Sequence, residues 1–317
     1  MSLSSKAQDI FDEAGKRSEE GLTRMRAVAA GVIGDDDRFI VGVNGSYARR
    51  EVTAGSDVDL FVLFRNDAIK EAQDVQAVLR ERLEADSFKM PAPGGVFSIP
   101  LTVSMLTQSI GGMDDTNEYI TRRMLLLLEG EWIHNPIQFE RARTRLLEQY
   151  VAATIRREQI CLFLLNDIIR YWRTICVDFE YKVQSDGKPR EIRLIKLRFS
   201  RMLLFFAGVM AVGATYGLER AEKIARLSEL LALPAHQRLL QLAGGKAHPA
   251  LELYAEFLEA LDDSATRNAL SMTSPVGQES SAFKTLRGKA QQFRLSLLDM
   301  LHSHFGNDNP TVAALML

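Results

Sequence analysis

The sequence has few residues of the kinds that build disulfides or histidine and cysteine metal sites. Among its 317 residues are two cysteines and five histidines. Cys161 and Cys176 lie in apolar, helix-like segments without metal-ligand spacing, and the histidines form no cluster. We therefore expect buried thiols in a reducing cytoplasm and no disulfide framework.

Long hydrophobic runs and a strong net charge are missing as well. The apolar run 202–214 is shorter than the roughly 18 residues that a membrane-spanning helix needs, so it predicts a helix buried inside a bundle. Residues 1–16 lack an apolar core, which argues against a signal peptide. The net charge of −2 gives no overall field that would draw the protein onto nucleic acid. We expect a cytoplasmic protein with no membrane segment.

The most informative stretch is residues 38–65, RFIVGVNGSYARREVTAGSDVDLFVLFR. Its β-branched and aromatic residues predict a strand at 38–43, which ends before Gly45. Ser46 begins a polar segment long enough for about two helical turns. A second strand is predicted at 57–64, so the order is strand, tight turn, short helix, loop and strand.

Two aspartates lie close together in the second of these strands. Side chains alternate between the faces of a strand, so Asp57 and Asp59 leave one face with Phe61, whereas Val58 and Leu60 leave the other. Two like charges so placed raise each other's pKa unless a cation lies between them. Such carboxylates suit Mg²⁺ or Mn²⁺, which completes its coordination with water and phosphate oxygens. We therefore predict that Asp57 and Asp59 are the catalytic metal ligands.

The turn before the short helix suits an anion. Gly45 allows the backbone to approach a ligand closely, and Ser46 begins a helix whose free N–H groups and dipole favour negative charge. A phosphate cradle and a metal platform then face each other within one strand-turn-strand unit. This combination predicts a site for a metal-bound nucleoside triphosphate such as ATP.

The same residues carry a resemblance to a known family. Gly45-Ser46, ten residues, and then Asp57-Val58-Asp59 resemble the signature of the DNA polymerase β-like nucleotidyltransferase superfamily, and Arg49 and Ser56 match its commoner variants. The resemblance implies that the Gly-Ser turn holds the outer phosphates and that the two aspartates bind the metals. It also implies that an acceptor attacks the α-phosphate. Gly45, Ser46, Arg49 and Ser56 are thus predicted to bind nucleotide.

The sequence departs from this family in one respect. The superfamily usually places a third carboxylate on a later strand, where it helps to deprotonate the acceptor, but no Asp or Glu occurs in residues 87–113. Asp114, Asp115 and Glu118 follow, and we interpret them as the cap and acidic first turn of the next helix. The binding half of the site is therefore supported by the sequence, and the acceptor-activating half is not.

A narrower resemblance concerns residues 104–130, which are loosely similar to the uridylyltransferase domain of PII signal-protein uridylyltransferases. The chain lacks the His-Asp dipeptide of the phosphohydrolase domain that those enzymes carry. The resemblance implies at most a stand-alone relative of that domain.

The rest of the chain predicts an α+β fold. Amphipathic helices at 3–33 and 67–86 back a mixed sheet, to which residues 96–106 contribute one or two strands. From residue 137 onward the pattern is helical. We expect a nucleotidyltransferase-type catalytic domain in residues 1–135 and an all-α bundle in 136–317 that closes over the nucleotide cleft.

Two basic stripes in the helical part are candidates for triphosphate binding. Arg170 and Arg173 share one face of a helix, and they either face the cleft or pair with Asp167, Asp178 or Glu180. The segment 190–201, REIRLIKLRFSR, is either a clamp on the phosphates, with Lys196 as its best single candidate, or a solvated basic face.

The last helical stripe, in residues 283–304, is spaced either for packing on its own bundle or for a dimer seam, so the oligomeric state stays open.

The predicted function is transfer of a nucleoside monophosphate from a Mg²⁺-bound triphosphate to an unidentified acceptor, with release of pyrophosphate. A protein or small-molecule acceptor is favoured over nucleic acid. The alternatives are a nucleotide-binding regulator that has lost transfer chemistry, because the third carboxylate is not evident, and a helical interaction scaffold.

Overall fold

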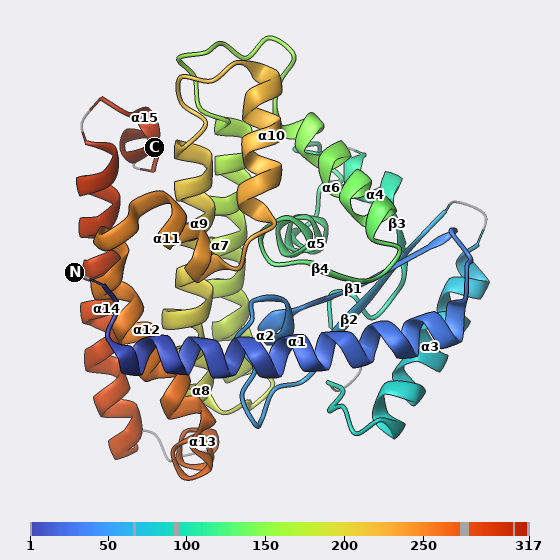
Figure 1. Ribbon diagram of the computed structural model, residues 1–317, viewed down its shortest axis with the longest axis horizontal. Helices are drawn as coiled ribbons and strands as arrows, with labels where there is room; N and C mark the ends of the chain where they lie inside the picture. Colours follow the sequence, from blue (N-terminus) through green and yellow to red (C-terminus); the bar gives the residue numbers. More distant parts are fainter. Residues whose placement is uncertain are drawn as a thin grey trace.

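The computed structural model describes residues 2–65, 68–91, 95–108, 110–272, 279–306 and 308–315. Figure 1 shows a sheet with flanking helices in one half and a bundle of helices in the other. The predicted α+β class is therefore confirmed.

Four strands form one mixed sheet. They are β1 (Phe39–Asn44), β2 (Asp59–Phe64), β3 (Leu101–Thr102) and β4 (Glu131–His134), in the order β3-β2-β1-β4. β1 is antiparallel to β2 and to β4, whereas β3 is parallel to β2. In the β1–β2 pair the last residue of β1, Asn44, lies opposite the first residue of β2, Asp59.

The predicted alternation along β2 is confirmed, because the two faces of the strand belong to different cores. Val58 and Leu60 pack in a core with α1 (Ser5–Ile33) and α3 (Ile69–Ala85). Phe61 and Leu63 pack in a second core with α5 (Asn117–Leu128) and α6 (Pro136–Tyr150). By the same alternation, Asp59 leaves the sheet on the side of this second core.

The remaining helices form the bundle. They are α7 (Leu162–Gln184), α8 (Arg190–Lys196), a π-helical turn (Leu197–Arg201), α9 (Met202–Gly213), α10 (Arg220–Leu231), α11 (Ala235–Ala243), a 3-10 turn (Gly244–Ala247), α12 (His248–Asp262), α13 (Ser264–Ser271), α14 (Ser281–Phe305) and α15 (Pro310–Ala314). In α9, the predicted buried helix, every residue except Phe205 is buried. Among the described residues, no helix is long and apolar enough to cross a membrane.

The first helix connects the two halves. α1 packs against α3 on the sheet side and against α12 in the bundle, and Figure 1 shows it crossing both halves of the molecule. Arg17 of α1 forms an ion pair with Asp262 at 2.8 Å. The second core also continues from the sheet into the bundle without a break. The division of the chain at residue 135 stays a prediction.

Three local points need correction or completion. Residues 96–106 contain only the short strand β3, because the Thr102 side chain accepts a hydrogen bond from the Met105 N–H and caps α4 (Val103–Thr107). β4 was not predicted, since its four residues are too few to show a pattern. The apolar stripe of α14 is buried within this chain's own bundle.

Candidate active site

The turn after β1 requires glycine for two reasons. Gly45 has a φ of +75°, a left-handed value that residues with a Cβ rarely adopt. A Cβ at this position would also collide with a carboxylate oxygen of Asp59. The turn backbone therefore lies directly against the predicted metal ligand, as a phosphate bridged to a metal requires.

The helix that follows this turn is shorter than predicted. α2 spans Gly45–Ala48, a single turn, so its dipole adds little to anion binding. The segment after it is irregular, and the Ser56 hydroxyl accepts a hydrogen bond from the Thr53 N–H at 3.0 Å. Ser56 thus holds the loop that leads to Asp57.

The two aspartates lie at the start of β2. The strand begins at Asp59, two residues later than predicted, because the Val58 N–H bonds to the Lys89 carbonyl at 2.9 Å outside the sheet. Burial raises the pKa of Asp59, and the neighbouring charge of Asp57 raises it further, to about 6. This is the electrostatic stress that a bound cation relieves.

These residues fit Mg²⁺ as part of a nucleotide complex. No group of three or more His, Cys, Asp or Glu side chains that could hold a metal occurs among the described residues. Mg²⁺, however, commonly takes one or two carboxylates and obtains its other ligands from water and substrate phosphates. Asp57 and Asp59, with the Gly45 turn against Asp59, offer that donor set.

A third acidic residue, which sequence reasoning missed, lies at the same place. Glu129 follows α5, and its carboxylate accepts hydrogen bonds from the Gly45 N–H at 3.2 Å and from Arg201 Nη1 at 3.1 Å. Arg49 also donates to it. Burial alone would raise the pKa of Glu129, but the two arginines outweigh burial and lower it to about 2. A fixed anion thus holds the glycine turn and two cations in one arrangement.

Arg49 lies in the site, but its guanidinium already has anionic partners. It is buried and pairs with Glu51 at 2.8 Å as well as with Glu129. Arg49 therefore stabilises the turn through Glu129, which also accepts the hydrogen bond from Gly45. Glu129 lies between α5 and β4, outside the strands of the sheet. β3 pairs with β2 only at Leu63 and Phe64, at the end of β2 away from Asp59.

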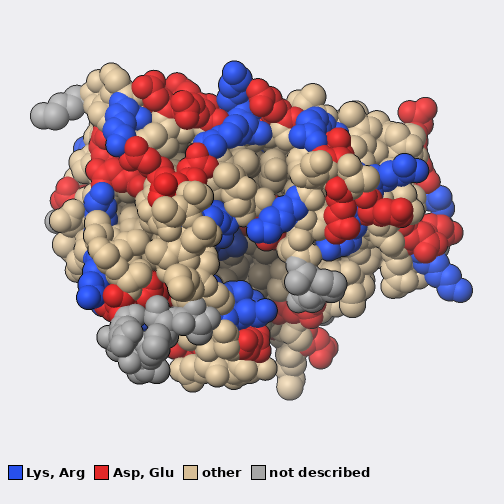
Figure 2. All heavy atoms as spheres, turned by 90° about the horizontal axis from the view of Figure 1, so that it is seen from below, with Lys and Arg blue, Asp and Glu red and all other residues tan. Residues whose placement is uncertain are grey.

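Two cavities meet at Asp59. A small one of about 90 Å³ is lined by Gly45, Ser46, Arg49, Glu51, Thr53, Ser56, Asp57 and Arg267, among others. A large one of about 630 Å³ extends along α5 and α7 and is lined by Asn44, Gln76, Phe97 and Tyr171, among others. Asp59, Lys196 and Arg201 line both. The face in Figure 2 is hollowed near its centre, and Lys and Arg side chains border the hollow.

Lys196 of α8 lies at this junction. Burial, together with the positive charge of Arg267, lowers its pKa to about 8, while the nearby Asp57 carboxylate acts in the opposite direction. None of the ion pairs found in the described part of the chain includes Lys196. Its ammonium group therefore points into the site without a fixed anionic partner.

Arg267 was not foreseen from the sequence. It belongs to α13 and donates hydrogen bonds to the Gly55 carbonyl and, at 3.2 Å, to the Thr53 hydroxyl. Arg267 forms no ion pair within the described residues, and it lines the small cavity together with Asp57. No sequence signal connects Arg267 with the motif, because the two are more than two hundred residues apart and only the fold joins them.

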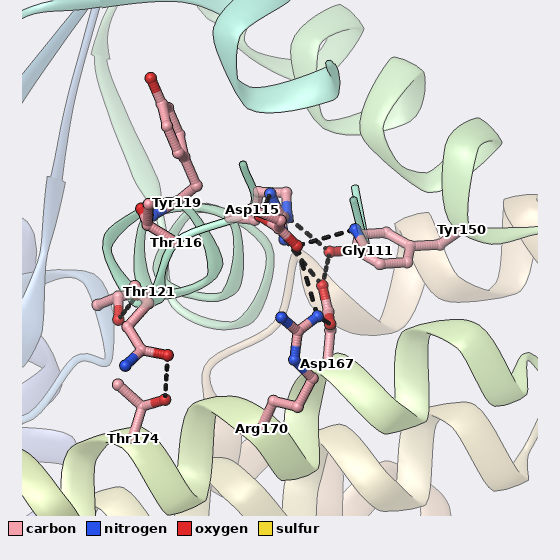
Figure 3. Close-up of polar contacts among 11 residues, drawn as sticks. Gly111, Asp115, Thr116, Tyr119, Thr121, Tyr150, Asp167, Arg170 and Thr174 are labelled. Atoms are coloured by element: carbon pink, nitrogen blue, oxygen red, sulfur yellow. Dashed lines mark hydrogen bonds and ion pairs between the residues drawn. The ribbon is translucent and has the colours of Figure 1, made fainter. Parts of the chain in front are cut away.

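Arg170 and Arg173, which were predicted to bind nucleotide, line neither of these two cavities. Arg170 pairs with Asp167 at 2.6 Å and with Asp115 at 3.4 Å, as Figure 3 shows. Arg173 is exposed on α7. Of the two alternatives for Arg170, the structure shows pairing with an acidic neighbour.

The structure bears out only part of the expectation for the acidic residues at the start of α5. The helix cap is Thr116, whose side chain accepts a hydrogen bond from the Tyr119 N–H. Asp115 is buried and holds both terminal nitrogens of Arg123 at 2.8 Å. Glu118 lies in the first turn, as predicted, and pairs with Arg122.

A comparison with protein families supports the nucleotide interpretation. Residues 37–89 match the family model described as Nucleotidyltransferase domain, a stretch that runs from β1 to the end of α3 and includes Gly45, Asp57 and Asp59. No curated protein matches the chain. The narrower likeness to PII uridylyltransferases gains no support from these comparisons.

Proposed function

We propose that the protein transfers a nucleoside monophosphate from a Mg²⁺-bound triphosphate to an acceptor and releases pyrophosphate. The observation that best supports this proposal is that a small cationic cavity and a large cavity meet at Asp59, beside the glycine turn. A triphosphate has its reacting phosphorus between a leaving pyrophosphate and a nucleoside, so it needs this arrangement of two unequal spaces.

Each residue has a distinct task in this proposal. The Gly45-Ser46 turn and Ser56 hold the outer phosphates in the small cavity. Lys196 and Arg267, which form no ion pair in the described part of the chain, neutralise the charge that gathers on the leaving pyrophosphate. Glu129 keeps Arg201 and the turn in position and binds no substrate itself.

The metal would be held by Asp57 and Asp59, and when bound it supplies Lewis-acid polarisation of the phosphate oxygens. In the transfer step the acceptor oxygen forms a bond to the α-phosphorus, the bond from that phosphorus to the bridging oxygen breaks to release pyrophosphate, and the acceptor's proton passes to water. Arg201, which lines both cavities, lies where it can bind the α-phosphate.

A second function rests on one specific observation. The described stretches of residues 87–113 place no carboxylate beside Asp59, and Glu129 is engaged by two arginines. A regulator that binds Mg²⁺ and nucleotide without transferring it would have such a site.

Label transfer tests the proposal directly. The protein is incubated with Mg²⁺ and each α-³²P-labelled triphosphate, together with the protein fraction or the small-molecule fraction of a cell lysate. We expect label on an acceptor in one fraction, loss of that label in Asp59→Asn, and full labelling in Asp74→Asn, a matched change at an exposed position of α3.

Thermal melting with the same nucleotides separates the alternatives. Nucleotide at a hundred times its Kd stabilises the native state by about 2.7 kcal/mol. Stabilisation without label transfer would establish that the protein is a regulator that binds nucleotide and does not transfer it. No stabilisation by any triphosphate would contradict both functions and leave the scaffold interpretation.

A further inference from the structure

The side chain of Asn44 is buried without a hydrogen bond. Asn44 is 2 % exposed, and both Oδ1 and Nδ2 lack a partner among the described residues. A buried polar group without a hydrogen bond destabilises the folded state, because it has lost its bonds to water. The protein carries this cost at the last residue of β1, directly opposite Asp59 and next to Gly45.

A local structural role does not account for the amide. Asn44 precedes α2, where asparagine often caps a helix, yet its side chain makes no capping bond. Its backbone takes part in the pairing of β1 with β2, which does not require an asparagine side chain. By the alternation along β1, the side chain leaves the sheet on the same side as Asp59, and Asn44 is among the residues that line the large cavity with Asp59, Glu129 and Tyr171.

The sizes of the two cavities fix the direction of a bound triphosphate, given the proposed function. The small cavity of about 90 Å³ has room for phosphate groups and none for a nucleoside. The large cavity of about 630 Å³ accommodates a sugar and a base. With the α-phosphate at Asp59, where the cavities meet, the group that enters the large cavity next to it is the sugar.

The chemistry of the amide selects the sugar's hydroxyl groups. An amide offers one acceptor and one donor group at adjacent atoms. A phosphate oxygen could accept from Nδ2 but would leave Oδ1 facing negative charge. A ribose hydroxyl both donates and accepts, and the vicinal 2′ and 3′ hydroxyls can satisfy the two amide atoms together.

From this complementarity we propose that Asn44 binds the ribose hydroxyls of the donor nucleotide and makes the site selective for ribonucleotides. The proposal rests on the proposed function and adds its sugar specificity.

Calorimetric binding with Mg²⁺ tests the proposal. The ligands are ATP, CTP, GTP and UTP, each compared with its 2′,3′-dideoxy form. For the wild type we expect the ribonucleotide to bind about tenfold more tightly, the gain from hydrogen bonds to a buried amide. In Asn44→Leu the two forms should bind equally, at the affinity of the wild type for the dideoxy form.

The melting temperature of the ligand-free variant separates this role from a structural one. If the amide stabilised the fold, its replacement would lower the melting temperature. Because the amide has no partner, its replacement by an apolar side chain of similar shape should leave the melting temperature of the ligand-free protein unchanged or raise it. Asn166→Leu, the same change at an exposed position of α7, should keep the tenfold preference. If Asn44→Leu does not fold, Asn44→Ala takes its place.

Three results would overturn the proposal. Equal binding of ribose and dideoxy forms by the wild type would overturn the sugar assignment alone and leave nucleotide binding intact. An unchanged preference in the Asn44 variant would place another ligand, such as the acceptor, at the amide. Failure of every triphosphate to bind would overturn this proposal together with the proposed function.

Discussion

Two clusters of buried charge lie at the ends of the same helix, α5, and they differ in one respect. Near the start of α5, Arg123 holds Asp115 through both terminal nitrogens at 2.8 Å and Asp167 at 3.0 Å, and its Nε donates to the Tyr150 hydroxyl. Tyr150 in turn donates to Asp167 (Figure 3). This closed cluster, formed by Arg123, Asp115, Asp167, Arg170 and Tyr150, has its charges compensated internally.

After α5 ends, Glu129 begins the second cluster. Glu129, Arg49, Glu51 and Arg201 are paired with one another, but two charges that border them are not. Within the described residues, Asp59 and Lys196 take part in no ion pair, and the amide of Asn44 has no hydrogen bond. This open cluster, formed by Glu129, Arg49, Glu51, Arg201, Asp59, Lys196 and Asn44, also carries raised and lowered pKa values.

The difference shows where the protein is less stable than it could be because a site is kept open for a ligand. Unpaired groups in a cavity wall disfavour the ligand-free state and are relieved when complementary charges bind. The closed cluster fastens α5 to α7 and has nothing left to offer a ligand. Mutations in the closed cluster should therefore affect folding, whereas mutations of unpaired groups in the open cluster should affect binding.

The largest effect is expected for Arg123→Met. The change leaves Asp115 and Asp167 buried with reduced compensation, so the free energy of unfolding should fall by about 3–5 kcal/mol. Denaturant unfolding measures it, and Arg173→Met at an exposed position of α7 should change it by less than about 0.5 kcal/mol. Nucleotide affinity of the folded Arg123 variant should stay at the wild-type level; a weakened affinity would break the proposed division between the clusters.

An intermediate effect is expected for Glu129→Gln. The folded pKa of about 2 lies below the usual value of 4.5, so the carboxylate stabilises the protein above pH 4.5 and loses this contribution as pH falls toward 2. We expect the variant to lose about 3 kcal/mol at pH 7. The difference from wild type should shrink steadily below pH 4.5.

Unfolding curves at several pH values measure this change. Glu140→Gln is the control, because Glu140 is half exposed and forms only a short-range pair with Arg143. A difference for Glu129→Gln that does not depend on pH would mean that shape alone, without charge, makes Glu129 important.

The smallest effect, with the opposite sign, is expected for Lys196→Met. Burial lowers the folded pKa to about 8, so the unfolded chain binds more protons between about pH 8 and 10.5 and the wild type gains stability as pH rises through that range. At pH 7 the variant should be more stable by about 1–2 kcal/mol, a value reduced for solvent screening.

The same variant should bind Mg²⁺-nucleotide more weakly, because a phosphate-facing charge is lost. Melting curves with and without nucleotide measure both effects, and Lys284→Met at an exposed position of α14 should show neither. A Lys196 variant that is less stable than wild type would show that the lysine is paired in solution and that the cluster is closed.

The parts of the site that could be predicted from the sequence are those set by local geometry. The period of two in β2 fixed which side chains share a face with Asp59, and that prediction is confirmed by the two cores. The glycine at position 45 follows from a turn that needs positive φ and a close approach of the backbone. Such features depend on neighbours in the chain, and a sequence shows those neighbours directly.

The tertiary structure alone decided which distant charges face the turn. From the sequence, Arg170, Arg173 and Lys196 were all candidates for triphosphate binding. In the structure Lys196 lines the small cavity, whereas Arg170 belongs to the closed cluster. Glu129, Arg267 and the open amide of Asn44 carried no local signal, because their roles come from segments that only packing brings together. The sequence by itself determined a turn, two aspartates and the class of fold. Packing decided which charges are compensated and which are left for a ligand, because compensation depends on three-dimensional neighbours.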